Sequence, residues 1–589
     1  MNNNKMIKTM KSKSIIGAVL AAIFTIGFTT SCEDMFNIES SRVIYEHNHD
    51  LGSTADSAYT TTGILQCVRE IADRYVILGE VRGDLVEINH LTKTSLRNIA
   101  EFNFEDDNEY LNIRDYYAVI NNCNYALAKM DTTLAHNNER VMIDEYAAIL
   151  GIRAWTYMQM AINYGEVPYF TEPITTVAAS EKEYPSLDIK EMAAELIPQL
   201  IPYIDYELPT FTGNNQVYPP LQLVLADLYL WSEDYANAWA TYWDYLTTNK
   251  NFNLSYGEVN SQEVFKGYMG INSAAIQAVQ VLGKSEAQIT GAWNAYFSTG
   301  ITATTGFENL AYITMESSSA RGKVSELASL FVSDDNTHQL NASTYLKEIC
   351  SSQSYIRANY TPEGEVKDHT INLMAGGDQR RKYYSTNRIA EGEAFEYYNK
   401  LVSSDISTGQ TEYVTPQINI YRRSIVYLRA AEALNALAKE QGSDSLAVMS
   451  FNLLKDAYQV FFPKGHVLKT ELQQAFIGVH ARGCGDVYLD TAVYVLKPNA
   501  IAQRLYNDPE QTVTFNDTLN YIDELIIDEL AMEAAVEGNR FGDLIRFAER
   551  RNEPEFLAKR VASRKGKDQM DDELYNKLMD KANWYLPIK

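Results

Sequence analysis

Apolar side chains recur at helical spacing through much of the chain, and this pattern predicts a mainly α fold. Residues 112–130 carry large apolar side chains every three or four positions, the period of a helix with one buried face. A second helix is predicted over 142–164. It is expected to end at Gly165, with Pro168 just beyond, because glycine and a following proline commonly terminate helices.

Two later segments predict helical hairpins. Pro220 is expected to begin a helix, residues 232–234 form a short turn, and the next helix places Ala238 one turn before Tyr242. A helix is predicted over 427–438, with Gly442 as the break after it. The next helix repeats the spacing of a small and a large residue, with Ala447 one turn before Phe451. Small residues let two antiparallel helices approach, as in tetratricopeptide-like repeats, although no even repeat period is present.

The helical period weakens over residues 251–417, where glycine, serine, threonine and asparagine dominate, for example in 298–306. Long irregular segments within a rigid scaffold commonly carry the binding function. We therefore expect a scaffold formed by about 51–250 and 418–589, and an irregular insert at about 251–417 that carries the ligand face.

The N-terminus reads as an export signal. Four lysines precede an apolar stretch of 14 residues, 15–28, which is too short to cross a bilayer as a helix. The stretch ends in Thr29-Thr30-Ser31-Cys32, which resembles a bacterial lipobox, although Thr29 stands where leucine is common. The prediction is a lipoprotein signal peptide over 1–31, a diacylated (palmitate-bearing) Cys32 and a tether over 32–50. The alternative is an ordinary cleaved signal peptide with a chance cysteine.

Charge narrows the classes of function. Among 589 residues there are 77 acidic and 51 basic side chains, and removal of the signal with its four lysines takes the formal net charge from −26 to −30. Such a chain repels nucleic acid phosphates and anionic membrane surfaces. The 40 tyrosines are also unusual. Some belong to helix cores, and the others are available for a binding surface.

No catalytic motif stands out. The chain has no G-x-S-x-G nucleophile elbow and no H-E-x-x-H zinc helix. Gly283-Lys284-Ser285 resembles the end of a phosphate loop, but Ala278 occupies the position of its first glycine. His47 with His49, and Asp334 with Asp335, read as a solvated linker and an acidic turn. A carboxylate-pair glycoside hydrolase stays open, because the acidic residues are too many for their spacing to be informative.

The four cysteines after Cys32 form no C-x-x-C pair and are expected to be buried free thiols, with an occasional disulfide left open. They are Cys67, Cys123, Cys350 and Cys484.

Several short segments are more specific than composition. In chain order they are Leu78-Gly79-Glu80-Val81-Arg82-Gly83-Asp84, Tyr116-Tyr117-Ala118-Val119-Ile120-Asn121-Asn122-Cys123-Asn124, Arg153-Ala154-Trp155, Tyr164-Gly165-Glu166-Val167-Pro168, Leu228-Tyr229-Leu230-Trp231, Tyr427-Leu428-Arg429-Ala430-Ala431-Glu432, Glu537-Gly538-Asn539-Arg540-Phe541-Gly542-Asp543 and Tyr585-Leu586-Pro587-Ile588. Together, over about 51–589, they resemble the SusD/RagB family of Bacteroidetes outer-membrane lipoproteins.

This resemblance implies a binding protein, not an enzyme, with no cofactor and no metal. Members of the family carry tetratricopeptide-like hairpins and a loop-rich ligand face. They work with a SusC-like TonB-dependent transporter and capture glycans, or peptides in the RagB branch. The chain is expected to be lipid-anchored in the outer membrane and to face the cell exterior. Glu33 and Asp34, directly after the lipid cysteine, resemble a surface-export signal.

The family pattern also suggests ligand contacts, for which packing or a salt bridge is the alternative. The candidates are Tyr75, Arg82, Asp84, Asn89, Trp293, Tyr296, Phe297, Asp378, Arg381 and Tyr384. Two further pairs, Arg540 with Asp543 and Arg429 with Glu432, have the spacing for ion pairs within one helix and are expected to serve the scaffold.

Overall fold

The fold is known from a computed structural model, which describes residues 51, 53–209, 217–248, 309–352, 356–360, 366–373, 385–390, 392–398, 400, 402–405, 412–455 and 496–588. These residues belong to two compact units. The first contains residues up to Ala72, Phe104–Ser232 and the C-terminal residues from Tyr585, and the second contains Asp73–Asn103 and Glu233–Trp584. Each unit is described on its own.

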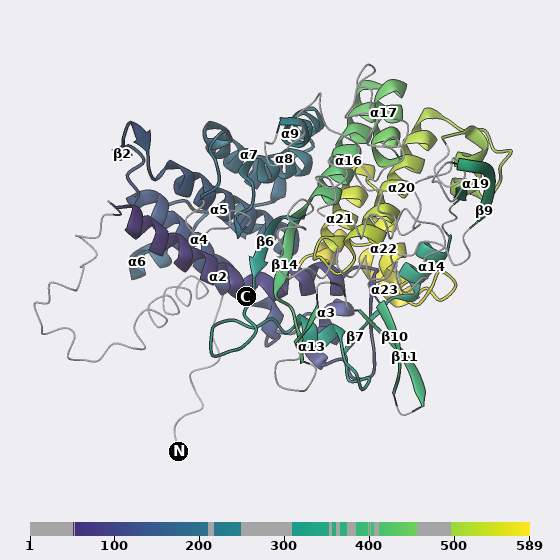
Figure 1. Cartoon of the computed structure of the whole chain (residues 1–589), viewed down its shortest axis with the longest axis horizontal. Helices are drawn as coiled ribbons and strands as arrows, with labels where there is room; N and C mark the ends of the chain where they lie inside the picture. The colour runs from purple at the N-terminus through teal and green to yellow at the C-terminus, as the bar shows by residue number, and fades with distance from the viewer. Residues whose placement is uncertain are drawn as a thin grey trace, which may run out of the picture. The chain divides into compact units, whose positions relative to one another are not determined.

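The first unit is built from packed helices (Figure 1). Helices α4 (Arg114–Lys129) and α5 (Ile143–Tyr164) lie side by side and are joined through a small hairpin. Helix α5 also packs against α7 (Ile189–Leu200) and α8 (Leu221–Trp231), and its buried residues supply much of the core. The remaining elements here are the first part of α2 (Thr54–Val81), η3 (Glu109–Leu111), β2 (Ala135–His136), β3 (Glu139–Arg140), β4 (Val167–Pro168), α6 (Val177–Ser180), β5 (Ser186–Leu187) and η4 (Ile201–Tyr203).

Local sequence signals explain where these helices begin and end. Helix α5 stops at Gly165, whose φ of +77° suits glycine, and α8 begins directly after Pro220. At the start of α7, Asp188 and Glu191 form a reciprocal capping box. The predictions of helices over 112–130, over 142–164 and after Pro220 are confirmed.

The second unit is centred on α16 (Arg423–Gln441), which packs against α9 (Tyr235–Thr248), α17 (Asp444–Lys455) and α20 (Phe515–Ala534). In Figure 1, α16 and α17 run side by side. Helix α16 ends at Gly442 in the left-handed conformation, as predicted. The small and aromatic residues of the predicted hairpin motifs are all buried, namely Ala238, Tyr242, Ala447 and Phe451.

The other helices of the second unit are short and mostly C-terminal. They are α3 (Thr94–Ala100), α13 (Leu327–Phe331), α14 (Thr344–Ser352), α19 (Pro498–Tyr506), α21 (Arg540–Arg551), α22 (Pro554–Ala562), α23 (Asp572–Leu578) and η7 (Lys581–Trp584).

Apart from one short strand after α2, the described strands of the second unit lie in residues 309–422, and all of them form two-stranded antiparallel pairs. Strand β6 (Asn309–Thr314) pairs with β14 (Gln417–Arg422), which leads directly into α16. Strand β7 (Leu340–Ala342) pairs with β1 (Val86–Ile88), with Val86 opposite Ala342. The pair β1–β7 therefore ties the residues after α2 to the segment that was predicted to carry the ligand face. The remaining strands are β8 (Ile356–Tyr360), β9 (Val366–Leu373), β10 (Ser385–Ala390), β11 (Glu393–Tyr398), β12 (Ser403–Asp405) and β13 (Glu412–Val414).

Some predictions fall outside the described residues, including the signal peptide, the tether, Cys32 and Cys484. The boundaries drawn at 250 and 417 between scaffold and insert stay predictions. Cys67, Cys123 and Cys350 are free thiols; Cys123 and Cys350 are buried as expected, whereas Cys67 is half-buried. In the portion of the chain that the structure describes, no helix combines the length and the apolar character that a bilayer crossing requires.

Candidate functional site

Three of the predicted ligand contacts lie in the interior of the second unit. The Tyr75 hydroxyl donates to Asn539 Oδ1 at 3.0 Å. Arg82 donates to the Leu78 and Trp584 carbonyls at 2.9 and 3.0 Å, and its guanidinium lies 4.3 Å from the centre of the Phe541 ring. This placement favours packing for Tyr75 and Arg82, which was the alternative to ligand contact.

Asp84 is also fully buried. Both of its oxygens accept hydrogen bonds from Arg540, at 2.6 and 2.7 Å, which makes a bidentate ion pair. The prediction that Arg540 pairs with Asp543 is therefore wrong. Asp543 instead accepts a hydrogen bond from Arg546 at 2.8 Å. The residue types were suited to pairing, but helical spacing could not reveal a partner 456 positions away in the sequence.

The two glycine-containing motifs meet backbone to backbone. A Cβ added to Gly79 would lie 1.9 Å from the Gly538 carbonyl oxygen, so only glycine fits there. Gly538 itself has φ of +86° and makes the turn between α20 and α21, as predicted. Next to this contact, the Glu80 carboxylate accepts hydrogen bonds from the backbone N–H groups of Gly538 and Val536, at 2.8 and 3.1 Å. These motifs hold the end of α2 against the α20–α21 turn.

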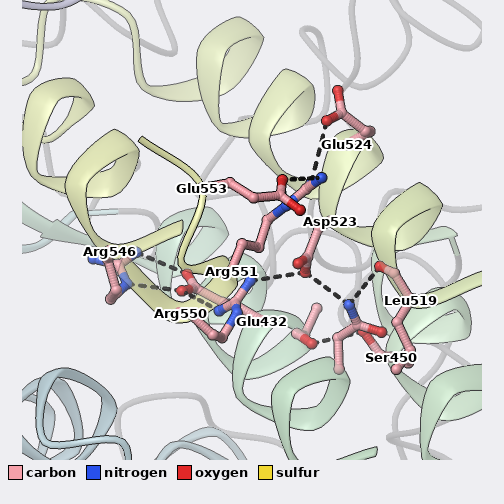
Figure 2. Close-up of polar contacts among 11 residues, drawn as sticks. Glu432, Ser450, Leu519, Asp523, Glu524, Arg546, Arg550, Arg551 and Glu553 are labelled. Carbon is pink, nitrogen blue, oxygen red and sulfur yellow. Dashed lines mark hydrogen bonds and ion pairs between the residues drawn. The ribbon is translucent and has the colours of Figure 1, made fainter. Parts of the chain in front are cut away.

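A second buried network joins α16, α20 and α21 (Figure 2). Glu432 accepts two hydrogen bonds from Arg546, at 2.8 and 2.7 Å, and one from Arg550 at 2.7 Å. Arg550 also donates to Asp523 at 2.8 Å, and Asn435 donates to the same carboxylate oxygen at 2.7 Å. The expected pairing of Arg429 with Glu432 is wrong, because Arg429 donates to Asn539 and Glu432 is held by the arginines of α21.

Burial raises the pKa of the Glu432 carboxyl, but the guanidinium groups of Arg546 and Arg550 outweigh it, so the net pKa is below its usual range. Glu432 is therefore ionised and paired at neutral pH. The network is closed to solvent and fixes the positions of helices. It has the chemistry of a scaffold, in line with the expected role of these motifs.

Asn89 is the one described candidate that lies near the surface. It follows β1, is half-buried, and donates from Nδ2 to the His338 carbonyl at 2.9 Å and to Asn341 Oδ1 at 3.3 Å. Arg97 donates to the Asn89 carbonyl at 2.8 Å. Asn89 thus orders the segment that precedes β7, and this segment leads to a group of aromatic rings.

We call this group the aromatic–acidic cluster. It consists of Asp334, His338, Phe395, Tyr397 and Tyr413, together with Asp335, which follows Asp334 in the chain and accepts a hydrogen bond from Thr337. The His338 ring centre lies 5.7 Å from that of Phe395 and 6.1 Å from that of Tyr397. Tyr397 lies 6.0 Å from Phe395 and 6.5 Å from Tyr413, also between ring centres. The rings come from β11, β13 and the loop before β7, so pairs of short strands assemble them.

The cluster has a buried base and an accessible rim. His338 and Tyr397 are buried, Phe395 and Tyr413 are half-buried, and both aspartates are exposed. The Tyr413 hydroxyl donates to Asp334 Oδ1 at 2.7 Å, which fixes the ring beside a carboxylate. Burial lowers the pKa of the His338 imidazole, so the base of the cluster is neutral at pH 7.

This arrangement suits recognition of a polar molecule with an apolar face. Phe395 and Tyr413 offer ring surface, and the carboxylates of Asp334 and Asp335 accept hydrogen bonds. Among the residues that the structure describes, no group of histidine, cysteine and acidic side chains is arranged to hold a metal ion. Asp334-Asp335 was expected to be an acidic turn, and Phe395 and Tyr413 were not among the predicted ligand contacts. The aromatic residues of Phe395-Glu396-Tyr397-Tyr398 were the available signal.

The other predicted ligand contacts lie outside the described residues. They are Trp293, Tyr296, Phe297, Asp378, Arg381 and Tyr384. They stay predictions.

Comparisons with known proteins agree with this fold. Residues 335–589 match the model of the SusD family. No curated protein sequence matches the chain. A SusD superfamily protein of Bacteroides thetaiotaomicron has 18% identity and a TM-score of 0.53, over 91% of this chain and 95% of that one. A SusD superfamily protein of Bacteroides vulgatus has 12% identity and a TM-score of 0.56, over 92% and 96%.

NanU of B. fragilis has 16% identity and a TM-score of 0.51, over 90% of this chain and 96% of its own. At these identities the structures show a shared fold. The mainly helical, SusD-like architecture predicted from the sequence is confirmed. The SusD family model therefore matches residues 335–589, and the solved structures show that the chain has a SusD-like fold.

Proposed function

We propose that this SusD-like protein is a cell-surface lipoprotein that captures an oligosaccharide or polysaccharide and delivers it to a SusC-like TonB-dependent outer-membrane transporter. The observation that carries the binding part is the aromatic–acidic cluster. A sugar ring has an apolar C–H face and a rim of hydroxyl groups, and half-buried aromatic rings beside exposed carboxylates match both.

The SusD family match over residues 335–589 supports the same class of ligand and argues against catalysis. The carboxylates of the cluster serve as hydrogen-bond acceptors in this proposal, and no residue acts as a nucleophile or general acid. Since sugar sites of this kind are shallow, affinity is expected to be modest. Binding of peptides or another nutrient oligomer, as in the RagB branch, is the second candidate.

A glycan array probed with the full mature chain tests the ligand class. Saturable binding to one group of glycans supports the proposal. Each bound glycan is then incubated with the chain and analysed by chromatography. Release of shorter sugars would show a glycoside hydrolase, and binding of peptides without any glycan would favour the RagB-like alternative.

Lipid anchoring rests on Cys32 and is tested separately. Cells expressing the chain are labelled with a palmitate analogue and fractionated. The wild-type chain is expected to carry the label in the outer-membrane fraction, and Cys32→Ser is expected to lose both label and membrane association. Equal labelling of the two proteins would contradict the anchor.

The transporter partnership is tested by co-purification. A tagged mature chain expressed in its native host is expected to retain a TonB-dependent transporter after detergent extraction of the membrane. Recovery of the chain without any such transporter would contradict the delivery step and leave the glycan-binding step standing.

A further inference from the structure

Three tyrosines of the first unit lie in a row at its surface. Tyr146 stands in the first turn of α5, Tyr203 ends η4, and Tyr206 follows it. The ring centres of Tyr146 and Tyr203 are 5.2 Å apart, and those of Tyr203 and Tyr206 are 6.0 Å apart. The rings are tilted by 42° and 38° from one to the next. We call these three residues the tyrosine platform.

The position of the platform follows from local structure. Helix α7 packs against α5 and continues directly into η4, which brings Tyr203 to the start of α5. The three rings therefore come from two segments that packed helices hold in place, so the platform is preformed.

These rings differ from the core tyrosines of the same unit. Tyr157 and Tyr116 are fully buried, and the Tyr157 hydroxyl donates to the Phe170 carbonyl at 2.6 Å. In contrast, Tyr206 is 37% exposed and Tyr146 and Tyr203 are half-buried. The platform thus leaves aromatic ring surface exposed to water. If these rings served only to pack the core, that surface would be buried.

The surroundings of the platform are acidic. Asp144 and Glu145 precede Tyr146 in the first turn of α5, while Asp205 and Glu207 flank Tyr206 and are exposed. Burial, and then the nearby Glu207 carboxylate, raise the pKa of Asp144, so acidic groups of the two segments face the same place. Carboxylates accept hydrogen bonds from hydroxyl groups and repel anions.

We propose that the tyrosine platform is a second carbohydrate-binding surface, separate from the aromatic–acidic cluster, and that it takes a neutral oligosaccharide. The ligand class follows from the chemistry of the surface. Successive rings offer planes on which successive sugar rings can stack, and the acidic rim accepts hydroxyl donors while it disfavours sulfated or uronate sugars. This inference rests on the proposed function for the biological role of glycan binding, and on its own residues for the site.

The test uses the full mature chain and neutral oligosaccharides of five or six sugar units, namely maltose-, cellulose-, xylan- and mannan-derived series. Calorimetry compares the wild-type chain with Tyr206→Ala, Tyr206→Phe and Tyr59→Ala. Tyr59 is 79% exposed in α2 and belongs to the same unit, so its variant controls for loss of an exposed ring. Because Tyr206 is exposed, circular dichroism is expected to be unchanged in every variant.

The double variant Phe395→Ala with Tyr413→Ala removes the cluster and separates the two sites. In this background a neutral oligosaccharide is expected to retain weak binding, and Tyr206→Ala is expected to weaken that binding at least fivefold. Tyr206→Phe should keep most of it, because the stacking plane is preserved.

Residual binding that Tyr206→Ala leaves unchanged, or the absence of any residual binding, would overturn the platform and leave the proposed function intact. Wild-type chain that binds no glycan would overturn both. A preference of the residual site for a cationic peptide over every neutral sugar would show that the acidic rim, and not the ring surface, selects the ligand, and would also overturn the inference.

Discussion

At the scale of single residues, the motifs that carry the family resemblance are explained by contacts between distant segments. Gly79 and Gly538 can approach closely because neither has a side chain. Asp84 accepts two hydrogen bonds from Arg540 in a bidentate ion pair. Sequence spacing identified the motifs but paired Arg540 with Asp543, since periodicity reports only neighbours within one helix. Long-range pairs of this kind depend on the complete fold.

Gly79 gives the sharpest prediction about stability. Gly79→Ala would place a Cβ 1.9 Å from the Gly538 carbonyl oxygen, so the two backbones would have to separate. We expect a loss of about 3 kcal/mol or more in the free energy of unfolding. Thermal or urea unfolding followed by circular dichroism measures the change.

The matched control lies in the same helix. A Cβ on Gly63 would meet nothing within 4 Å, so Gly63→Ala is expected to stabilise the chain by roughly 0.5–1 kcal/mol. Equal effects of the two substitutions would contradict the close approach of Gly79 and Gly538.

The buried Glu80 carboxyl is expected to make the free energy of unfolding depend on pH. Burial raises the pKa of this carboxyl from 4.5 to about 7, against the opposing effect of the Gly538 and Val536 amides. Between these values the folded chain keeps a proton that the unfolded chain has lost. The free energy of unfolding therefore falls as pH rises through this interval, by up to about 3 kcal/mol, and this contribution levels off above it.

Unfolding measured at about pH 5, 6 and 7 checks the sign. Glu80→Gln carries a neutral amide at every pH and is expected to lose this part of the slope. Glu70→Gln, at an exposed position of the same helix, is expected to keep it. A steeper fall in Glu80→Gln than in the wild-type chain would contradict the protonated state of the buried carboxyl.

At the scale of elements, the helices were predictable and the strand pairs were not. Helices α5 and α16 ended at Gly165 and Gly442 as predicted, because apolar period and terminating glycine are local signals. Within residues 309–422, β6 and β7 pair with distant strands, β14 and β1, whereas β8–β9, β10–β11 and β12–β13 are pairs of neighbouring strands. The rings of the aromatic–acidic cluster come from β11, β13 and the loop before β7, which belong to three different strand pairs, so its members could not be grouped from the sequence.

The contacts between α16 and α21 depend on Glu432. Glu432→Gln would remove the buried carboxylate that Arg546 and Arg550 share. Asp543 and Asp523 would remain as their charged partners, but one negative charge would be missing from the buried network, and we expect a loss of about 3 kcal/mol in the free energy of unfolding. Chemical unfolding of the purified variant measures this loss.

Glu553 provides the comparison. It pairs with Arg551 at 2.8 Å, but its side chain is 48% exposed, so Glu553→Gln is expected to cost less than about 1 kcal/mol. If the Glu553 variant lost as much stability as the Glu432 variant, burial would not be what makes the α16–α21 network important.

At the scale of the whole molecule, the sequence predicted the class of fold, and the ligand face stays a prediction. The helical scaffold and the SusD-like architecture followed from periodicity and motifs. The ligand face was expected in the insert, and the aromatic–acidic cluster lies within its predicted bounds. The excess of tyrosine divides between buried rings such as Tyr157 and accessible rings such as Tyr413 and Tyr206.

The central claim is that the aromatic–acidic cluster binds a glycan, and calorimetric titration of the best glycan from the array into the full mature chain tests it most directly. The double variant Phe395→Ala with Tyr413→Ala is expected to raise the dissociation constant at least tenfold. Ile389→Ala, which removes a 78% exposed apolar side chain from β10 in the same unit, is expected to leave the constant unchanged. Unchanged affinity in a correctly folded double variant would contradict the account.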